Sequence, residues 1–419
     1  MNKYKVVAFG AGQVFQIFLK LYSSDKIDII FVCDNDIKKQ GKVIQGIPVI
    51  SPLQIKNLNY DKIIITTAKS KMIKNQLLEI KGIDEKKILD FFCVYNRINS
   101  LNNNVWNEYL KSDFLTALYA QENNMLQRKI FELERKNAFL NAKIISDSYC
   151  NKKICCLEDV EFQVFSQFGE DGIIQWIIKN TNIKNKKFIE FGVENYLESN
   201  TRFLLMNNNW SGLVIDASEE YVHQIMDWDL YWRYDLTAIS AFITKDNINK
   251  IITNAGFDGE IGILSIDIDG NDYWILNVIN CVNPQILICE YNNLFGNEKK
   301  LTIPYQENFY RTNSHYSNLY YGASLQAFCD FAEKHDYYYL GSNSAGHNAF
   351  FVKKDCFDSS NIPEYSKRFI YSKYKESRGK DGKLNYLNRN QRLNEIKDMK
   401  LLDLESENLS TIADIFNLL

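Results

Sequence analysis

Short apolar runs recur along the chain, most of them ending at a glycine or an acidic residue, and this pattern predicts buried strands of mostly parallel sheets. In the first ninety-six residues the runs occupy 5–9, 28–33, 62–67 and 86–93. After residue 156 they occupy 187–191, 212–216, 261–267 and 285–290. Because helical stretches separate these runs, we expect an α/β protein with two Rossmann-like sheets.

Three segments follow from this pattern. We expect residues 1–96 to form a small Rossmann-like domain, 97–155 a helical linker, and 156–419 a larger α/β domain. A chain of 419 residues is long enough for two or three such domains. In the last segment, the runs 336–340 and 348–352 lie close enough in the sequence to form an antiparallel hairpin.

The linker contains a stretch, 105–145, without glycine or proline. Within it, residues spaced alternately by four and three follow a heptad pattern: Leu126, Ile130, Leu133, Asn137, Leu140 and Ile144. The pattern favours a homo-oligomer joined through this helix. A helix that packs on its own domains predicts nearly the same pattern.

Composition excludes several classes of protein. The net charge of -3 gives no general affinity for nucleic acid. No apolar run approaches the ~18 residues of a membrane span, and Gly10 and Gly12 interrupt the apolar start too early for a signal peptide. The nine cysteines are scattered, without a Cys-x-x-Cys pair, so we expect neither disulfides nor zinc, and a cytoplasmic location.

The first domain carries a candidate nucleotide-binding turn. Gly10-Ala11-Gly12 follows the first predicted strand, and Asp34 follows the second, 22 residues after Gly12. Phe15 stands where the third glycine of a dinucleotide motif would be, which weakens the case for NAD. With the Asp34-Asn35-Asp36 turn, this segment resembles small amino-terminal domains of surface-polysaccharide biosynthesis proteins, such as sugar acyltransferases, that bind a nucleotide sugar. A degenerate domain that only packs or assembles is an equal alternative.

The second domain carries a stronger signal at its first predicted strand. Glu190 lies within the apolar run, where an unpaired carboxylate is costly, and Gly192 follows the run. Asp216 ends the next run, 24 residues after Gly192. A glycine and an acid in this order are typical of nucleotide sites at the carboxyl ends of parallel strands.

Seven ordered blocks make this domain resemble a known family. They read Ser-Gln-Phe-Gly-Glu-Asp-Gly at 166–172, Glu-Phe-Gly-Val-Glu-Asn at 190–195, Glu-Ser-Asn-Thr-Arg at 198–202, Leu-Ser-Ile-Asp-Ile-Asp-Gly-Asn-Asp-Tyr-Trp at 264–274, Glu-Tyr-Asn at 290–292, Tyr-Gly-Ala-Ser-Leu at 321–325 and Asn-Ala-Phe-Phe-Val at 348–352. Together they resemble the FkbM-like methyltransferases found with capsule and lipopolysaccharide gene products, over about residues 165–406. The resemblance implies a class I Rossmann-like methyltransferase fold, whose parallel sheet finishes in an antiparallel hairpin.

The resemblance also implies S-adenosylmethionine as cofactor. Gly192 would admit its amino-acid part, Glu190 would orient its ammonium group, and Asp216 would accept hydrogen bonds from its ribose. Three further polar residues match positions around the same cleft, with capping or loop hydrogen bonding as an equal alternative: Gln167, Asn200 and Thr201.

A group of carboxylates is the sharpest chemical feature. Asp267 and Glu290 end neighbouring predicted strands, and Asp269 lies two residues beyond Asp267. Three roles are open: ligands of Mg²⁺, a general base for the acceptor, or structural hydrogen bonding. His347, before the last predicted strand, is a further candidate for removing a proton, and a loop histidine without a catalytic role is its alternative.

The resemblance implies a methyltransferase that acts on oxygen of a nucleotide-linked or glycan precursor of capsular polysaccharide or lipopolysaccharide. Two alternatives are a nicotinamide-dependent oxidoreductase built on Gly10–Asp34 and a non-enzymatic scaffold that binds a nucleotide sugar.

Overall fold

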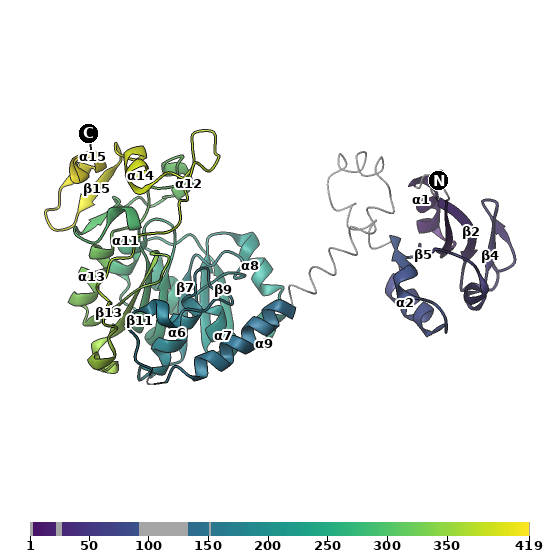
Figure 1. The fold of residues 1–419 in the computed structure, drawn as a ribbon, viewed down its shortest axis with the longest axis horizontal. Coiled ribbons are helices and arrows are strands. Elements are labelled where there is room, and N and C mark those ends of the chain that lie inside the picture. The colour runs from purple at the N-terminus through teal and green to yellow at the C-terminus, as the bar shows by residue number, and fades with distance from the viewer. Residues whose placement is uncertain (1–2, 22–26, 92–132, 151, 419) are drawn as a thin grey trace. The chain divides into compact units, whose positions relative to one another are not determined.

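The computed structural model describes residues 3–21, 27–91, 133–150 and 152–418. The chain divides into two compact units, Met1–Glu134 and Arg135–Leu419, and each has its own sheet and its own core (Figure 1). The predicted boundaries at residues 96 and 155 stay predictions. Among the helices that the structure describes, none is both long enough and apolar enough for a membrane span.

The first unit is a doubly wound α/β layer. Its sheet has the order β3-β4-β2-β1-β5-β6, and all pairs are parallel except β3 with β4. The elements are β1 (Tyr4–Phe9), α1 (Gln13–Leu21), β2 (Ile27–Cys33), β3 (Val43–Ile44), β4 (Ile47–Ile50), β5 (Lys62–Ile65), α2 (Ser70–Glu79) and β6 (Ile88–Asp90). The last strand begins two residues later than predicted, because a short 3₁₀ helix, Glu85–Lys87, precedes it.

Alternation along β1 explains the two faces of this sheet. Val6 and Ala8 pack on one face with Phe18 of α1, whereas Val7 packs on the other face with Leu77 of α2. Side chains alternate across a strand, so one strand serves both cores.

The second unit is built on a seven-stranded sheet with the order β13-β14-β11-β10-β7-β8-β9. The strands are β7 (Lys187–Phe191), β8 (Ser211–Asp216), β9 (Leu236–Ser240), β10 (Gly259–Ile266), β11 (Val282–Glu290), β13 (Tyr337–Ser342) and β14 (Asn348–Lys353). β14 pairs antiparallel with both β11 and β13, and the other neighbours are parallel. The predicted α/β class and the predicted terminal hairpin are confirmed: the last strand is inserted between β11 and β13.

Helices cover both faces of this larger sheet. One core contains α6 (Glu170–Lys179), α7 (Arg202–Asn208) and α8 (Glu219–Met226). The other contains α10 (Ile248–Asn254), α11 (Asp272–Val278) and α13 (Leu325–Lys334). The carboxyl ends of the central strands are therefore left open between the two helical layers.

A small accessory layer was not predicted. It consists of a three-stranded sheet, β12 (Leu301–Thr302), β15 (Lys400–Asp403) and β16 (Leu409–Thr411), with α14 (Arg389–Glu395) and α15 (Ile412–Phe416). These strands have two to four residues each, too short for a periodic pattern.

A helix over 133–147 precedes the larger sheet. Phe139 packs against Phe203, with ring centroids 5.1 Å apart, and Ala142 is buried in the same cluster. The heptad residues Leu140 and Ile144 are 57% and 71% exposed, so they lie away from this contact. Leu126 and Ile130 lie outside the described residues, and the homo-oligomer stays a prediction.

One close contact fixes the ends of β7 and β10. Gly192 follows β7 with a φ of +70°, and a Cβ added there would lie 1.7 Å from the backbone oxygen of Asp267. A side chain at residue 192 would therefore push the two strand ends apart.

Gly192→Ala should destabilise the larger unit by about 3 kcal/mol or more, because it adds this collision to the strain of a positive φ. Gly256→Ala is the matched control, since Gly256 has a φ of +73° and open space around it. There we expect a cost of about 1 kcal/mol in chemical denaturation. Equal costs for the two variants would contradict this account of Gly192.

Candidate active site

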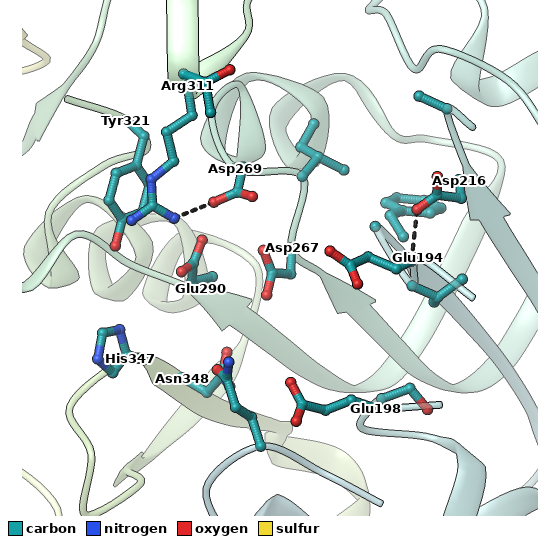
Figure 2. A pocket seen from close by; sticks show the side chains of 18 of the residues that line it. Glu194, Glu198, Asp216, Asp267, Asp269, Glu290, Arg311, Tyr321, His347 and Asn348 are labelled. Atoms are coloured by element: carbon teal, nitrogen blue, oxygen red, sulfur yellow. Dashed lines mark hydrogen bonds and ion pairs between the residues drawn. The ribbon is translucent and has the colours of Figure 1, made fainter. Parts of the chain in front are cut away.

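A cavity of about 710 Å³ lies at the carboxyl ends of the central strands of the larger unit. Residues that end or follow four of these strands line it: Gly192 follows β7. The others are Asp216 on β8, Asp267 after β10 and Glu290 on β11 (Figure 2). Nine of the ten predicted site residues line the cavity: Gln167, Glu190, Gly192, Asn200, Asp216, Asp267, Asp269, Glu290 and His347. Thr201 is fully buried and is not among the lining residues.

Glu190 holds the loop that leads into α7. Its carboxylate accepts the backbone N–H groups of Asn200 (2.8 Å) and Thr201 (3.1 Å) and the hydroxyl of Thr201. Burial raises its pKa to about 7, against these hydrogen bonds. Thr201 therefore holds the carboxylate of Glu190 in position instead of facing the cavity. The predicted contact of Glu190 with an ammonium group stays a prediction.

Asn200 connects the same loop to β10. Its side-chain amide donates to the hydroxyl of Ser265, 3.1 Å away. Gln167 lines the cavity from the segment before α6. Its backbone carbonyl accepts a hydrogen bond from the side-chain amide of Gln163 (2.9 Å).

Asp216 closes β8 beside the glycine loop. It accepts the backbone N–H groups of Glu194 (2.7 Å) and Ser218 (2.8 Å), one on each carboxylate oxygen. Burial raises its pKa, and no ion pair reaches it from the described residues. Each oxygen keeps a lone pair for a further donor, as the hydroxyls of a ribose would supply.

The three predicted carboxylates do come together. One oxygen each of Asp267, Asp269 and Glu290 lie within 4.8 Å of one another. The register of β10 with β11, which pairs Ile266 with Cys289, makes Asp267 and Glu290 neighbours. Asp272 accepts two backbone N–H groups of the turn between β10 and α11 and so stabilises the bend that carries Asp269.

The three carboxylates lie close enough to repel one another. Burial, followed by the neighbouring carboxylates, raises the pKa of both Asp267 and Glu290 well above the usual range. The Oε2 atom of Glu290 is shielded from solvent and has no hydrogen-bond partner among the described residues. The pair therefore retains a proton near neutral pH or binds a cation. The donor set of three carboxylates fits Mg²⁺.

Arg311 is a site residue that sequence reasoning missed. It comes from α12 (Arg311–Ser314), forms an ion pair with Asp269 and lies 3.8 Å from the centre of the Tyr321 ring. Its Nε donates to the carbonyl of Asn318 at 2.8 Å. A four-residue helix gives no periodic signal, and nothing in the sequence links residue 311 to residue 269.

His347 lines the cavity as a neutral imidazole. Burial, helped by the charges of Arg311 and Arg392, lowers its pKa to about 4. Its Nε2 lies 3.2 Å from the hydroxyl of Ser372, and its ring stacks on Phe168 at 5.3 Å. Its low basicity makes it a weaker acceptor of a proton than the carboxylate pair.

Asn348 is a second residue without a predicted role. It pairs with Glu290 across β14 and β11, and its Nδ2 donates to the buried carboxylate of Glu170 at 2.9 Å. Its Oδ1 has no hydrogen-bond partner among the described residues, although the residue is only 7% exposed. An unpaired buried oxygen in a cavity wall points to a donor on a ligand.

Asp267→Asn should flatten the fall of melting temperature as pH rises above about 4, the usual pKa of an aspartate in the unfolded chain, by at least ~2 °C. The raised pKa values mean that the folded state binds more protons than the unfolded state, so wild-type stability falls as pH rises. The variant removes one carboxylate of the pair and with it the repulsion. Exposed Asp258, outside the cavity, supplies the control Asp258→Asn, and equal slopes in all three proteins would contradict the assignment.

A family model matches most of the described part of the first unit. Residues 2–89 match the model of a family described as C2185-like, N-terminal. No curated protein matches the chain.

Three solved structures are similar at low identity. UDP-D-quinovosamine 4-dehydrogenase from Vibrio fischeri is 21% identical over 24% of this chain and 86% of its own, with a TM-score of 0.19. TehB from Haemophilus influenzae is 10% identical over 45% of this chain and 63% of its own, with a TM-score of 0.28. Methyltransferase FkbM from Methylobacillus flagellatus KT is 14% identical over 69% of this chain and 80% of its own, with a TM-score of 0.20. At these scores the fold assignment rests on the strand order and pairing of the two sheets.

Proposed function

We propose that the chain is an S-adenosylmethionine-dependent methyltransferase. The observation that carries the proposal is the cavity between Gly192 and Asp216 on a sheet whose last strand, β14, is inserted antiparallel. The resemblance of the seven sequence blocks to FkbM-like methyltransferases supports the same function. That resemblance also supports the acceptor class, a nucleotide-linked or glycan precursor of capsular polysaccharide or lipopolysaccharide.

The residues around Gly192 and Asp216 fit the cofactor. Gly192 offers backbone without a side chain, and Asp216 offers free lone pairs without a competing cation among the described residues. Phe242 and Ile243 line the cavity after β9 and provide apolar surface for an adenine ring. When bound, the cofactor supplies a methyl group on a positively charged sulfur.

The residues beyond β10 would then serve the acceptor. An acceptor hydroxyl must lose its proton as the new bond forms, and a base works best when its pKa lies near the working pH. Burial and the neighbouring carboxylates raise the pKa of Asp267 and Glu290 well above the usual range and so make them stronger bases, whereas the pKa of His347 is lowered. We therefore assign proton removal to the carboxylate pair and the orientation of the acceptor to His347.

Mg²⁺ is part of the proposal as a second cofactor. Asp267, Asp269 and Glu290 would hold it, and the unpartnered Oε2 of Glu290 supports such a site. A bound cation would remove the repulsion among the three acids and lower their pKa values, so Mg²⁺ binding is an alternative to proton removal by the pair, with the ion polarising the acceptor oxygen.

The first unit is the less favoured nucleotide site. Asp34 accepts the backbone N–H of Ala11 at 2.8 Å, as Asp216 accepts that of Glu194, but it also pairs with Lys39 at 3.1 Å. A ribose at Asp34 would have to compete with this ion pair. The oxidoreductase alternative therefore has less support than the methyltransferase.

Calorimetric titration with S-adenosylhomocysteine tests the function. We expect wild type to bind in the micromolar range, ~-8 kcal/mol, and Asp216→Ala to weaken binding about tenfold or more, because two hydroxyl hydrogen bonds are lost. Asp34→Ala, the equivalent change in the first unit, should leave the affinity unchanged. Loss of binding in Asp34→Ala alone would move the nucleotide site to the first unit, and no binding by wild type would refute the proposal.

Titration with MgCl₂ tests the metal. We expect Asp269→Asn to weaken Mg²⁺ binding about tenfold or more, because one of three charged ligands is lost. Asp269 has a side chain that is 57% exposed, so the variant should fold normally. Heat of binding that is the same in wild type and variant would exclude this cluster as the metal site.

A further inference from the structure

Charge is distributed unevenly around the cavity. Eight carboxylates line it, against three cationic side chains, Arg311, Lys375 and Arg378. Arg311 is already paired with Asp269, and the other two belong to the segment 371–386. The part formed by β7, β8 and their loops therefore carries acids and no cation among its described lining residues. A cleft lined by one sign of charge concentrates its field on whatever it binds.

Two of these acids have no internal role. Glu194 and Glu198 lie on the loop between β7 and α7, and neither carboxylate has a hydrogen bond or ion pair among the described residues. Figure 2 shows both side chains pointing toward the space in front of Asp267, opposite Arg311 and His347. Burial, then the charges of Glu170 and Glu194, raises the pKa of Glu198, and the charge of Arg135 opposes this shift.

The loop that carries them is fixed from both sides. The backbone N–H of Glu194 is held by Asp216 at 2.7 Å. The guanidinium of Arg202 donates to the carbonyls of Tyr196 (3.1 Å) and Leu197 (3.2 Å) and stacks on Trp228 at 4.7 Å. The backbone of the loop is therefore held, while both glutamates, which line the cavity, are exposed to solvent.

A separate observation points to a ligand in the same space. The Oδ1 atom of Asn348 is unpartnered, and its residue is only 7% exposed and lines the cavity. Its amide nitrogen is held by Glu170, so the amide cannot turn to present a donor instead. The two carboxylates are exposed, so the buried amide oxygen is the group that needs a donor on a ligand, and the carboxylates favour a ligand that brings positive charge.

We propose that Glu198, assisted by Glu194, attracts the positively charged sulfonium of the cofactor, so that the protein binds S-adenosylmethionine more tightly than S-adenosylhomocysteine. This inference rests on the proposed function and adds a specificity-determining residue to it. It also assigns these acids a part in exchanging the spent cofactor for a fresh one.

The reaction itself removes the charge. The carbon–sulfur bond breaks with its electron pair on sulfur, which turns the sulfonium into a neutral thioether. The methyl carbon bonds to the acceptor oxygen, and the acceptor proton passes to the Asp267–Glu290 pair. After transfer, Glu194 and Glu198 face a cofactor with one positive charge fewer, and the attraction that held it falls.

Calorimetry with three ligands tests this inference: S-adenosylmethionine, S-adenosylhomocysteine and sinefungin, a stable analogue with an amine in place of the sulfonium methyl. For wild type we expect both charged ligands to bind about tenfold more tightly than S-adenosylhomocysteine. Glu198→Gln should reduce this ratio about fivefold or more while leaving the affinity for S-adenosylhomocysteine within about twofold. Glu220→Gln, an exposed acid on α8 outside the cavity, is the control and should keep the wild-type ratio.

The outcomes separate the two proposals. Equal affinities of wild type for charged and neutral ligands would overturn the inference and leave the methyltransferase proposal intact. Equal weakening of all three ligands by Glu198→Gln would give Glu198 a general contact instead of charge recognition and would also overturn it. If wild type binds none of them, the proposed function fails, and the inference fails with it.

Discussion

The approach of Gly192 to the carbonyl of Asp267 is the constraint on which the site depends. It brings the ends of β7 and β10 into backbone contact, and both strand ends carry residues that line the cavity. On one side of the contact, Glu190 and Asp216 hold the loop after β7 by accepting its backbone N–H groups. On the other, the turn after β10 presents Asp267 and Asp269 to Glu290. The absence of a side chain at this glycine allows the two strand ends to approach each other, and it also leaves backbone open to a ligand.

The two units contain the same kind of hydrogen bond between strand ends, in different surroundings. In each, an acid at the carboxyl end of one central strand accepts a backbone N–H from the loop after the neighbouring strand: Asp34 accepts from Ala11, and Asp216 accepts from Glu194. This bond ties adjacent strand ends together whether or not a ligand is present. Only the surroundings differ: Lys39 neutralises Asp34, whereas Asp216 belongs to a cavity rich in acids. Similar strand-glycine-acid patterns therefore do not imply similar binding.

The sequence allowed the strands and the acid cluster to be predicted, because both depend on local patterns. Buried strands appear as apolar runs, and Asp267 and Glu290 end adjacent runs, which places them at one sheet edge. Arg311 and Asn348 could not be predicted, since their roles come from contacts with residues 42 and 178 positions away. Thr201 was assigned to the cleft from its motif, yet its hydroxyl is used by Glu190. Sequence spacing locates a strand end but does not say which side chains there face inward.

The insertion of β14 between β11 and β13 has a consequence for how the protein is made. β11 pairs with β14 over Ile286–Glu290, and β14 is completed only at residue 353. During synthesis, more than sixty further residues must be added after β11 before β14 is complete, and until then one edge of β11 has no partner strand. Open apolar edges attract other chains. Ribosome-bound or truncated chains that stop before β14 would thus be the aggregation-prone forms of this protein, even though most of the sheet already exists in them.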